Sequence, residues 1–236
     1  MAGSVIETLI ARQLHQYNHL KAVLRERPAV APPPRRPVVT VSRMAGCSAS
    51  ELAVPLAERL GVQVWDSELV DLVASDTGLR REFVAELDEG LVNSVEAWVR
   101  GILGGRLFMR DDYALALAAT VKTLAETGGA ILVGRGAGFI LGDRADLRLR
   151  LAASERHRVD ALRKAKNGNR SRIHEDMLRV DAARAAFVRS YFQADVNDNS
   201  HYDLVLNTER VAVGVMVEIC ECLVRSRRMQ SSAAAG

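Results

Sequence analysis

Five short apolar runs, separated by longer segments with helical features, constrain the fold more than any other feature of this sequence. Each run is rich in Val, Leu or Ile, a composition that suits strands buried on both faces. Strands joined through helices form right-handed crossovers and therefore a parallel sheet. The pattern predicts an α/β fold in which helices cover both faces of a parallel sheet. The predicted strands span residues 38–42, 62–65, 130–133, 147–151 and 204–207.

The segments between these runs contain signals for helix starts and ends. Helical periodicity runs from Glu51 to Leu60, and Gly61 follows as a C-cap. A Ser/Ala-rich flexible tail is predicted over residues 226–236. Further helices are predicted at 68–74, in pieces over 79–126, at 154–166, at 174–194 and at 211–224.

The first 37 residues form a predicted appendage to this domain. Residues 4–27 fit an amphipathic helix, and the proline-rich stretch that ends at Pro37 fits an extended linker. Six basic and two acidic residues lie within residues 1–37, while the whole chain carries a net charge of +3. Such a helix can dock on its own domain, form a homo-oligomer or bind a protein partner. A solvated arm explains the basic charge more simply than nucleic-acid binding does.

Composition excludes several classes of protein. Hydrophobic residues make up 48% of the chain and charged residues 26%, as in ordinary soluble globular domains. No run approaches the roughly 18 apolar residues of a spanning helix, so we expect no membrane segment. The three cysteines, an odd count without a recognisable signal peptide, predict a reducing, cytoplasmic environment. The histidines are scattered, and no metal cluster or nucleophile motif is predicted.

A turn of small residues follows the first predicted strand, from Gly46 to Ser50. Successive backbone N–H groups in such a turn, with a helix N-terminus behind them, can hold a phosphate. The lysine and second glycine of the usual phosphate-loop pattern are absent. Ser48 and Glu51 also fit a capping box, which begins helices of any function. The local sequence leaves both interpretations open.

Four motifs occur in one order along residues 38–224, and together they resemble the cytidylate kinase-like family of P-loop nucleoside monophosphate kinases. They are Ser42-Arg43-x-x-Gly46, Leu60-Gly61-x-x-x-x-Asp66, Ile131 to Ala137, and Tyr202 to Thr208. The resemblance implies a three-layer P-loop kinase fold with a helical lid over about residues 154–194. It further implies ATP and Mg²⁺ as cofactors and a nucleotide as substrate.

The resemblance assigns the donor side of the site to the turn after the first strand. In the family this loop looks like Ser-Arg-x-x-Gly-Ser-Gly-Gly-Arg-Glu, and here Gly46 and Glu51 keep their places while residues 47–50 differ. Gly46, Ser48 and Ser50 are expected to hold the donor phosphates, and Ser50 to contribute a hydroxyl to Mg²⁺. Arg43 is the nearest cation that substitutes for the absent lysine.

The resemblance also assigns acceptor and lid residues. Asp66 and Arg135 match positions that bind the acceptor nucleotide, although Asp66 also suits a helix N-cap and Arg135 a surface turn. Arg158, Arg179 and Arg184 match lid arginines that neutralise charge during phosphoryl transfer. Solvation of a helix face explains any single one of these arginines equally well.

Two functions of different classes remain open from the sequence. One is a nucleoside monophosphate kinase that transfers the γ-phosphoryl group of ATP to a nucleotide, with a pyrimidine nucleotide as the expected acceptor. The other is a catalytically inactive kinase-fold protein that binds nucleotides or regulates a partner, which the altered loop and the appended helix favour. A nucleic-acid-associated protein that acts through the basic arm ranks third.

Overall fold

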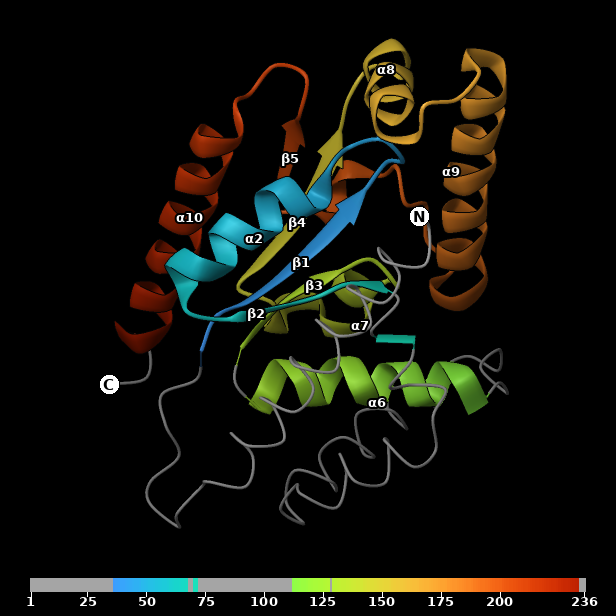
Figure 1. Cartoon of the computed structure of the whole chain (residues 1–236). Helices are drawn as coiled ribbons and strands as arrows, with labels where there is room; N and C mark the ends of the chain where they lie inside the picture. Colours follow the sequence, from blue (N-terminus) through green and yellow to red (C-terminus); the bar gives the residue numbers. More distant parts are fainter. Residues whose placement is uncertain (1–35, 68–69, 72–111, 128, 234–236) are drawn as a thin grey trace, which may run out of the picture.

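The fold is built on a sheet of five parallel strands in the order β2-β3-β1-β4-β5 (Figure 1). The computed structural model describes residues 36–67, 70–71, 112–127 and 129–233. All five predicted strands are present, and the predicted three-layer α/β fold is confirmed. The strands are β1 (Val38–Arg43), β2 (Gln63–Trp65), β3 (Ala130–Val133), β4 (Leu147–Ala152) and β5 (Leu204–Asn207).

The register of the sheet brings the predicted site turns to one edge. Val41 of β1 lies beside Val133 of β3, and Ser42 lies beside Arg150 of β4. The chain leaves β1 and β3 at neighbouring points on the carboxyl edge of the sheet, where ligands bind in open α/β folds. The turns after Ser42 and Val133 therefore face the same space.

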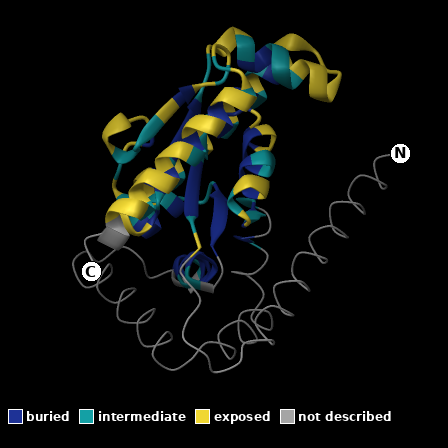
Figure 2. Ribbon diagram, turned by 90° about the vertical axis from the view of Figure 1, so that its left-hand side faces the viewer, coloured by how far each residue is buried: buried dark blue, intermediate teal, exposed yellow. Residues whose placement is uncertain are grey.

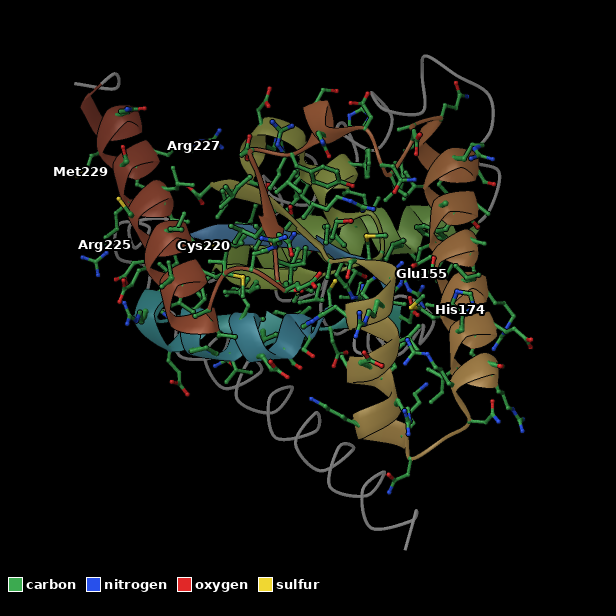
Figure 3. All side chains as sticks on the ribbon, turned by 90° about the horizontal axis from the view of Figure 1, so that it is seen from above. Glu155, His174, Cys220, Arg225, Arg227 and Met229 are labelled. Carbon is green, nitrogen blue, oxygen red and sulfur yellow. The ribbon has the colours of Figure 1, made fainter. Side chains whose placement is uncertain are left out.

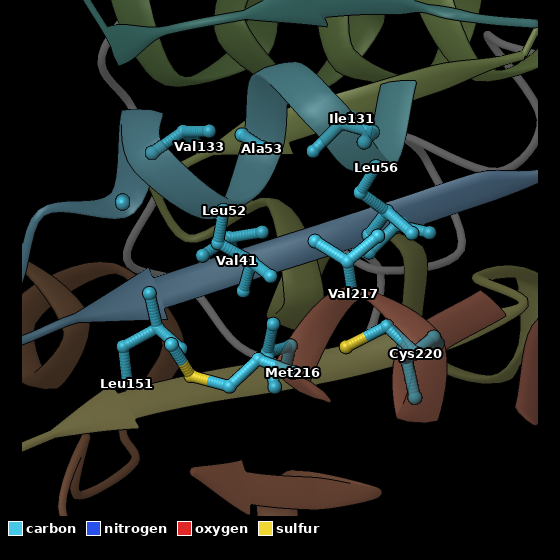
Figure 4. Packing of buried hydrophobic residues seen from close by; sticks show 14 of the residues in the cluster. Val41, Leu52, Ala53, Leu56, Ile131, Val133, Leu151, Met216, Val217 and Cys220 are labelled. Carbon is cyan, nitrogen blue, oxygen red and sulfur yellow. The ribbon is translucent and has the colours of Figure 1, made fainter. Parts of the chain in front are cut away.

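Helices α2 (Ala49–Leu60) and α10 (Val213–Ala233) cover one face of the sheet. Their apolar side chains meet Val41 and Leu151 of the central strands in one buried cluster (Figure 4). Leu52 and Leu56 of α2 are at most 1% exposed, and each such buried leucine contributes roughly 1.5–3 kcal/mol to folding. This packing fixes the start of α2, which follows the small-residue turn.

Helices α6 (Asp112–Thr127) and α7 (Ala137–Leu141) cover the opposite face, and the 3₁₀ turn η1 (Gly142–Arg144) follows α7. Leu117, Val121 and Leu124 of α6 are buried in a second cluster with residues of β3 and α7. The helix predicted over 79–126 is confirmed where the chain is described, from Asp112 onward. Its earlier part and most of the helix predicted at 68–74 lie outside the described residues.

Helices α8 (Glu155–Lys166) and α9 (Arg170–Phe192) stand above the carboxyl edge, where Figure 1 shows them beside the tips of β1 and β4. The Ser154 side chain accepts from the His157 N–H to cap α8, and Asn169 accepts from Ser171 and Arg172 to cap α9. About half of the residues in each of these helices are exposed, in contrast to the largely buried strands β1, β3 and β4 (Figure 2). A second 3₁₀ turn, η2 (Asn199–His201), precedes β5.

Several helix boundaries differ from the sequence-based prediction. Helix α9 begins at Arg170 rather than at residue 174, because the Asn169 cap starts it one turn earlier. Helix α10 continues to Ala233, so the flexible tail predicted from Ser226 is wrong over most of its length. Arg227 donates to Asp203 at 2.9 and 3.0 Å and Arg228 lies 3.8 Å from Asp146, which ties this end of the helix to the sheet.

The appended helix and nearly all of the proline-rich linker predicted within residues 1–37 lie outside the described residues. In the described part of the chain, no helix combines the length and the apolar character needed to cross a bilayer. All three cysteines are free thiols, with Cys47 and Cys220 buried and Cys222 exposed.

Candidate active site

A cavity of about 400 Å³ lies at the carboxyl ends of β1 and β3, against helix α9. Its described walls come from the end of β1, Ser67 after β2, the β3–α7 turn, one face of α9 and residues 196–202. The lining combines cationic, aromatic and small polar groups, as an organic anion would require. The lining residues are Thr40, Val41, Ser42, Arg43, Ser67, Gly134, Arg135, Gly136, Ala137, Gly138, Phe139, Arg179, Val180, Ala183, Arg184, Phe187, Val188, Val196 and Tyr202.

Four of the arginines assigned from the sequence line this cavity: Arg43 at the end of β1, Arg135 after β3, and Arg179 and Arg184 on α9. The Arg184 guanidinium donates to the Arg43 carbonyl at 3.1 Å, so α9 is held against the end of β1. Arg43 donates to the Ser67 hydroxyl at 3.3 Å, and Arg179 pairs with Asp176 at 3.0 Å.

Positive charge accumulates around Arg184. Burial lowers the pKa of Arg184, and the nearby charges of Arg135 and Arg150 act in the same direction, while Asp181 opposes them. Its side chain is 33% exposed, so it remains accessible from the cavity. A concave region with several cations attracts anionic ligands.

Arg135, the predicted acceptor ligand, follows β3 in a left-handed conformation with φ +49° and lines the cavity. Its guanidinium binds the Asp71 carboxylate in a fork, with Nε 2.7 Å from Oδ1. Tyr113 of α6 donates to the same carboxylate at 2.6 Å, and burial together with Asp71 raises the pKa of Tyr113. Asp71 thus orients Arg135, a role that the sequence-based analysis missed.

Asp66 takes the position that the sequence predicted, directly after β2. The Asp66 carbonyl accepts from the Val70 N–H at 3.1 Å, so the chain turns into a helix at this point. Asp66 is not among the cavity-lining residues, whereas its neighbour Ser67 is. The structure therefore brings Arg135 into the cavity and leaves Asp66 at its margin.

Aromatic rings also line the cavity, with Phe139 on α7, Phe187 on α9 and Tyr202 before β5. The Phe139 ring stacks on Phe192 with centroids 5.4 Å apart and meets the Tyr202 ring edge-on at 6.4 Å. Gly136 allows this packing, because a Cβ there would lie 2.2 Å from the Phe192 ring. A flat apolar group of a ligand could pack against these rings.

The phosphate-loop candidate is a tight turn between β1 and α2. The Cys47 N–H bonds to the Met44 carbonyl at 3.2 Å, and Gly46 has φ +86°. A Cβ on Gly46 would lie 2.7 Å from the Arg158 carbonyl, so the loop packs directly against α8. Glycine is required at this position both by its backbone conformation and by this close approach.

A lid carboxylate already binds the loop backbone. Asp181 of α9 accepts from the Ala45 N–H at 2.7 Å and pairs with Arg158 of α8. Arg158 is 4% exposed, and its guanidinium also donates to the Ala45 carbonyl at 3.0 Å. Arg158 therefore lies beneath the loop and does not line the cavity, unlike Arg179 and Arg184.

Ser48 and Ser50 are exposed at the beginning of α2. Ser48 occupies the N-cap position, but its side chain makes no capping hydrogen bond, so the capping box considered from the sequence does not form. The two hydroxyls thus face solvent beside the loop, where they could contact a donor phosphate.

Ser50 could supply one oxygen ligand to Mg²⁺, which commonly takes its remaining ligands from substrate phosphates and water. Among the described residues no cluster of acidic, His or Cys side chains could hold a metal alone.

The two lid helices also contact each other near the site. His174 of α9 and Glu155 of α8 lie 2.7 Å apart and face each other across the interhelical gap (Figure 3). Val159, Ile173 and Met177 pack with Ala45 of the loop in a small buried cluster. The lid and the loop thus form one packed unit in this structure.

Sequence analysis missed the aromatic residues of the cavity and Asp71, and it also missed Arg150, which is 6% exposed and donates to Ser42 of the cavity wall at 3.0 Å. Phe139 and Phe187 belong to helical patterns that gave no reason to separate them from ordinary core residues. Arg150 had a detectable signal: the run Leu-Arg-Leu-Arg-Leu at residues 147–151 places two arginines on one face of a strand whose two faces are both covered.

Comparisons with known proteins show the family to which this chain belongs. A cytidylate kinase of Methanothrix thermoacetophila is 29% identical over 174 residues, covering 73% of this chain and 89% of that protein. A cytidylate kinase of Natronomonas pharaonis is 26% identical over 193 residues, covering 80% and 90%. The crystal structure of an uncharacterized protein from Eubacterium ventriosum has a TM-score of 0.63 at 17% identity, covering 81% of this chain and 99% of that one, which is a likeness of fold. A family model described as "Cytidylate kinase-like family" matches residues 38–210, most of the chain, and the protein therefore belongs to the cytidylate kinase-like family.

Proposed function

We propose that this protein is a nucleoside monophosphate kinase that transfers the γ-phosphoryl group of ATP to a pyrimidine nucleotide such as CMP. The observation that carries the proposal is the cavity beside the phosphate-loop candidate. It combines the arginines Arg43, Arg135, Arg179 and Arg184 with aromatic side chains. Family membership and the cytidylate kinases among the relatives support the same reaction class.

The acceptor would lie with its base on the Phe139 and Phe187 rings and its phosphate toward the arginines. Guanidinium groups bind phosphate oxygens through paired N–H donors, and aromatic rings stack on bases. Arg135, already oriented by Asp71, would hold the ribose or phosphate end of the acceptor. This arrangement uses a cavity of about 400 Å³.

In the transfer step an oxygen of the acceptor phosphate attacks the γ-phosphorus of ATP, and the bond from that phosphorus to the ADP oxygen breaks. The acceptor phosphate is already an anion, so no general base is required. Arg184 would neutralise charge on the transferring group, because it lies between the cavity and the end of β1. Ser50 would hold Mg²⁺, which would supply positive charge to the donor phosphates, and Gly46 and Ser48 would lie beside those phosphates.

An inactive kinase-fold protein is the second candidate, and one observation favours it. The Ala45 N–H, which a donor phosphate could use, is occupied by the Asp181 carboxylate, and no lysine follows the loop. Such a protein would bind a nucleotide in the cavity without transferring phosphate.

The two candidates are separated by ³¹P NMR of the full chain with MgATP and each nucleoside monophosphate in turn. A kinase produces ADP and nucleoside diphosphate signals at equal rates, and Arg184→Ala should reduce both by more than about tenfold. The variant also controls for contaminating kinases, whose signal would not change. Nucleotide binding without any diphosphate signal across the panel would support the inactive protein instead.

A further inference from the structure

Strand β4 carries two arginines on the same face of the sheet, and they differ in how their charge is compensated. Arg148 donates to the Asp203 carboxylate through its backbone N–H at 2.7 Å and through its guanidinium at 2.9 and 3.3 Å. Arg227 of α10 shares the same carboxylate. The charge of Arg148 is therefore balanced within the fold, as buried charges usually are.

Arg150, two residues further along the strand, is only 6% exposed and has neutral partners. Its guanidinium donates to Ser42 Oγ at 3.0 Å and to Asn197 Oδ1 at 2.8 Å, and it lies over the Tyr202 ring at 5.5 Å. Among the described residues no carboxylate pairs with it. A buried cation without a counter-ion is costly, so its presence next to a cavity calls for an anion from outside the chain.

The partners of Arg150 connect it to the cavity wall. Ser42 and Tyr202 both line the cavity, and both receive contacts from Arg150, with the Tyr202 hydroxyl at 3.5 Å. The Tyr202 hydroxyl donates to the Val196 carbonyl at 2.8 Å, which fixes its ring. Ser42 Oγ accepts from Arg150 and lies 3.3 Å from the Tyr202 hydroxyl, so the Ser42 proton can point either to that hydroxyl or to a ligand in the cavity.

We propose that Arg150 is a positioning residue for an anionic acceptor: it fixes Ser42 and Tyr202 in the cavity wall and places an uncompensated positive charge behind them. The ligand class it selects is a phosphate monoester, in preference to the uncharged nucleoside. This proposal rests on the proposed function only for the location of the acceptor. It concerns equilibrium binding, which can be measured without any phosphoryl transfer.

The test compares binding of CMP and of cytidine to the full chain by isothermal titration calorimetry. Arg150→Met removes the charge at similar length, and we expect CMP binding to weaken about tenfold, as for one lost charge-assisted interaction, with cytidine binding changed less than twofold. Arg150→Lys, which keeps the charge, should recover most of the CMP affinity. The salt dependence of CMP binding should also become shallower in Arg150→Met.

Arg148→Met is the matched control, because Arg148 lies on the same strand and face but is balanced by Asp203. It should lower thermal stability and leave the ratio of CMP to cytidine affinity unchanged. Asn197 is exposed, so Asn197→Ala removes one hydrogen-bond acceptor of the Arg150 guanidinium without changing the core. This variant should weaken CMP binding about twofold to threefold.

The outcomes separate this proposal from the proposed function. Unchanged CMP affinity in both Arg150→Met and Asn197→Ala, or an equal loss for CMP and cytidine, would overturn the role of Arg150. Failure of the wild-type chain to bind CMP would overturn it as well. CMP binding that depends on Arg150 in a protein without phosphoryl transfer would remove the kinase proposal and leave this one in place.

Discussion

The phosphate-loop candidate and the cavity lie at the same edge of the sheet, yet they differ in how the positive charge of their arginines is balanced. At the loop, the buried Arg158 is paired with Asp181, and the same carboxylate accepts from the Ala45 N–H. In the cavity, Arg43, Arg179 and Arg184 surround an open volume, with the uncompensated Arg150 behind the wall.

This difference indicates how the two sides would receive ligands. Arg135 and Arg179 have carboxylate partners, but no carboxylate is among the described residues that line the cavity, so an acceptor phosphate would not have to displace one from its wall. At the loop the chain supplies its own anion, and a donor phosphate at the Ala45 N–H would have to displace Asp181. Since Asp181 belongs to α9, that displacement would move the lid.

Replacing the lid carboxylate should produce the largest effect. In Asp181→Asn the side chain still accepts from the Ala45 N–H, but Arg158, 4% exposed, loses its counter-ion. Leaving one member of a buried pair uncompensated costs about 3 kcal/mol, so we expect the free energy of unfolding to fall by about that amount. Urea denaturation followed by circular dichroism measures it.

Asp176→Asn is the control for this variant. Asp176 is on the same helix and pairs with Arg179, but both side chains are at least 50% exposed, and its loss should leave the urea midpoint unchanged. If Asp181→Asn were as stable as Asp176→Asn, the lid carboxylate would not hold the loop, and the contrast between loop and cavity would disappear.

The loop glycine should give the next largest effect. Gly46→Ala introduces a Cβ at φ +86° and 2.7 Å from the Arg158 carbonyl, and we expect a loss of about 2 kcal/mol in the free energy of unfolding. Gly61→Ala is the matched control, since Gly61 also has positive φ but nothing lies within 4 Å of its Cβ position. It should cost about 1 kcal/mol. Equal losses in the two variants would show that backbone strain alone matters and that the loop does not pack tightly on α8.

The fold was predictable because its signals are local. Each strand is a short apolar run, and strand–helix alternation restricts the topology to a parallel sheet. The end of α10 was not predictable in the same way, because Ser226 and its neighbours look like a tail. What keeps them helical is the contact of Arg227 with Asp203, two residues that are 24 positions apart.

The candidate site was predictable only in part, for the same physical reason. Arg135 and Arg184 were identified from short motifs, and both line the cavity. Asp71, which orients Arg135, lies 64 residues before it, and Asp181 reaches Ala45 across 136 positions. A sequence shows which residues can pair, whereas the partner that each one finds depends on how the layers pack.

Removing an arginine from the cavity tests whether its positive charge is needed for catalysis. In Arg184→Ala we expect kinase turnover to fall by more than about tenfold, because the variant lacks the cation nearest both the cavity and β1. The stability loss should be small, as the side chain is 33% exposed. Arg189→Ala, on the same helix but exposed and outside the cavity, should retain full turnover. Unchanged turnover in Arg184→Ala would remove Arg184 from the site.

The smallest expected effect is a change in thiol reactivity at the loop. Burial raises the pKa of Cys47, and it raises the pKa of Cys220 to about 12, so both thiols stay protonated at about pH 8, whereas Cys222 is exposed. With a thiol reagent such as iodoacetamide, mass spectrometry should find Cys222 modified at least about tenfold faster than the other two.

Cys47 and Cys220 belong to the same buried cluster, but only Cys47 lies in the loop. Asp181→Asn should therefore accelerate modification of Cys47 and leave Cys220 unaffected. Equal acceleration at both buried cysteines would indicate general unfolding rather than release of the loop, and no acceleration at Cys47 would show that Asp181 does not restrain it.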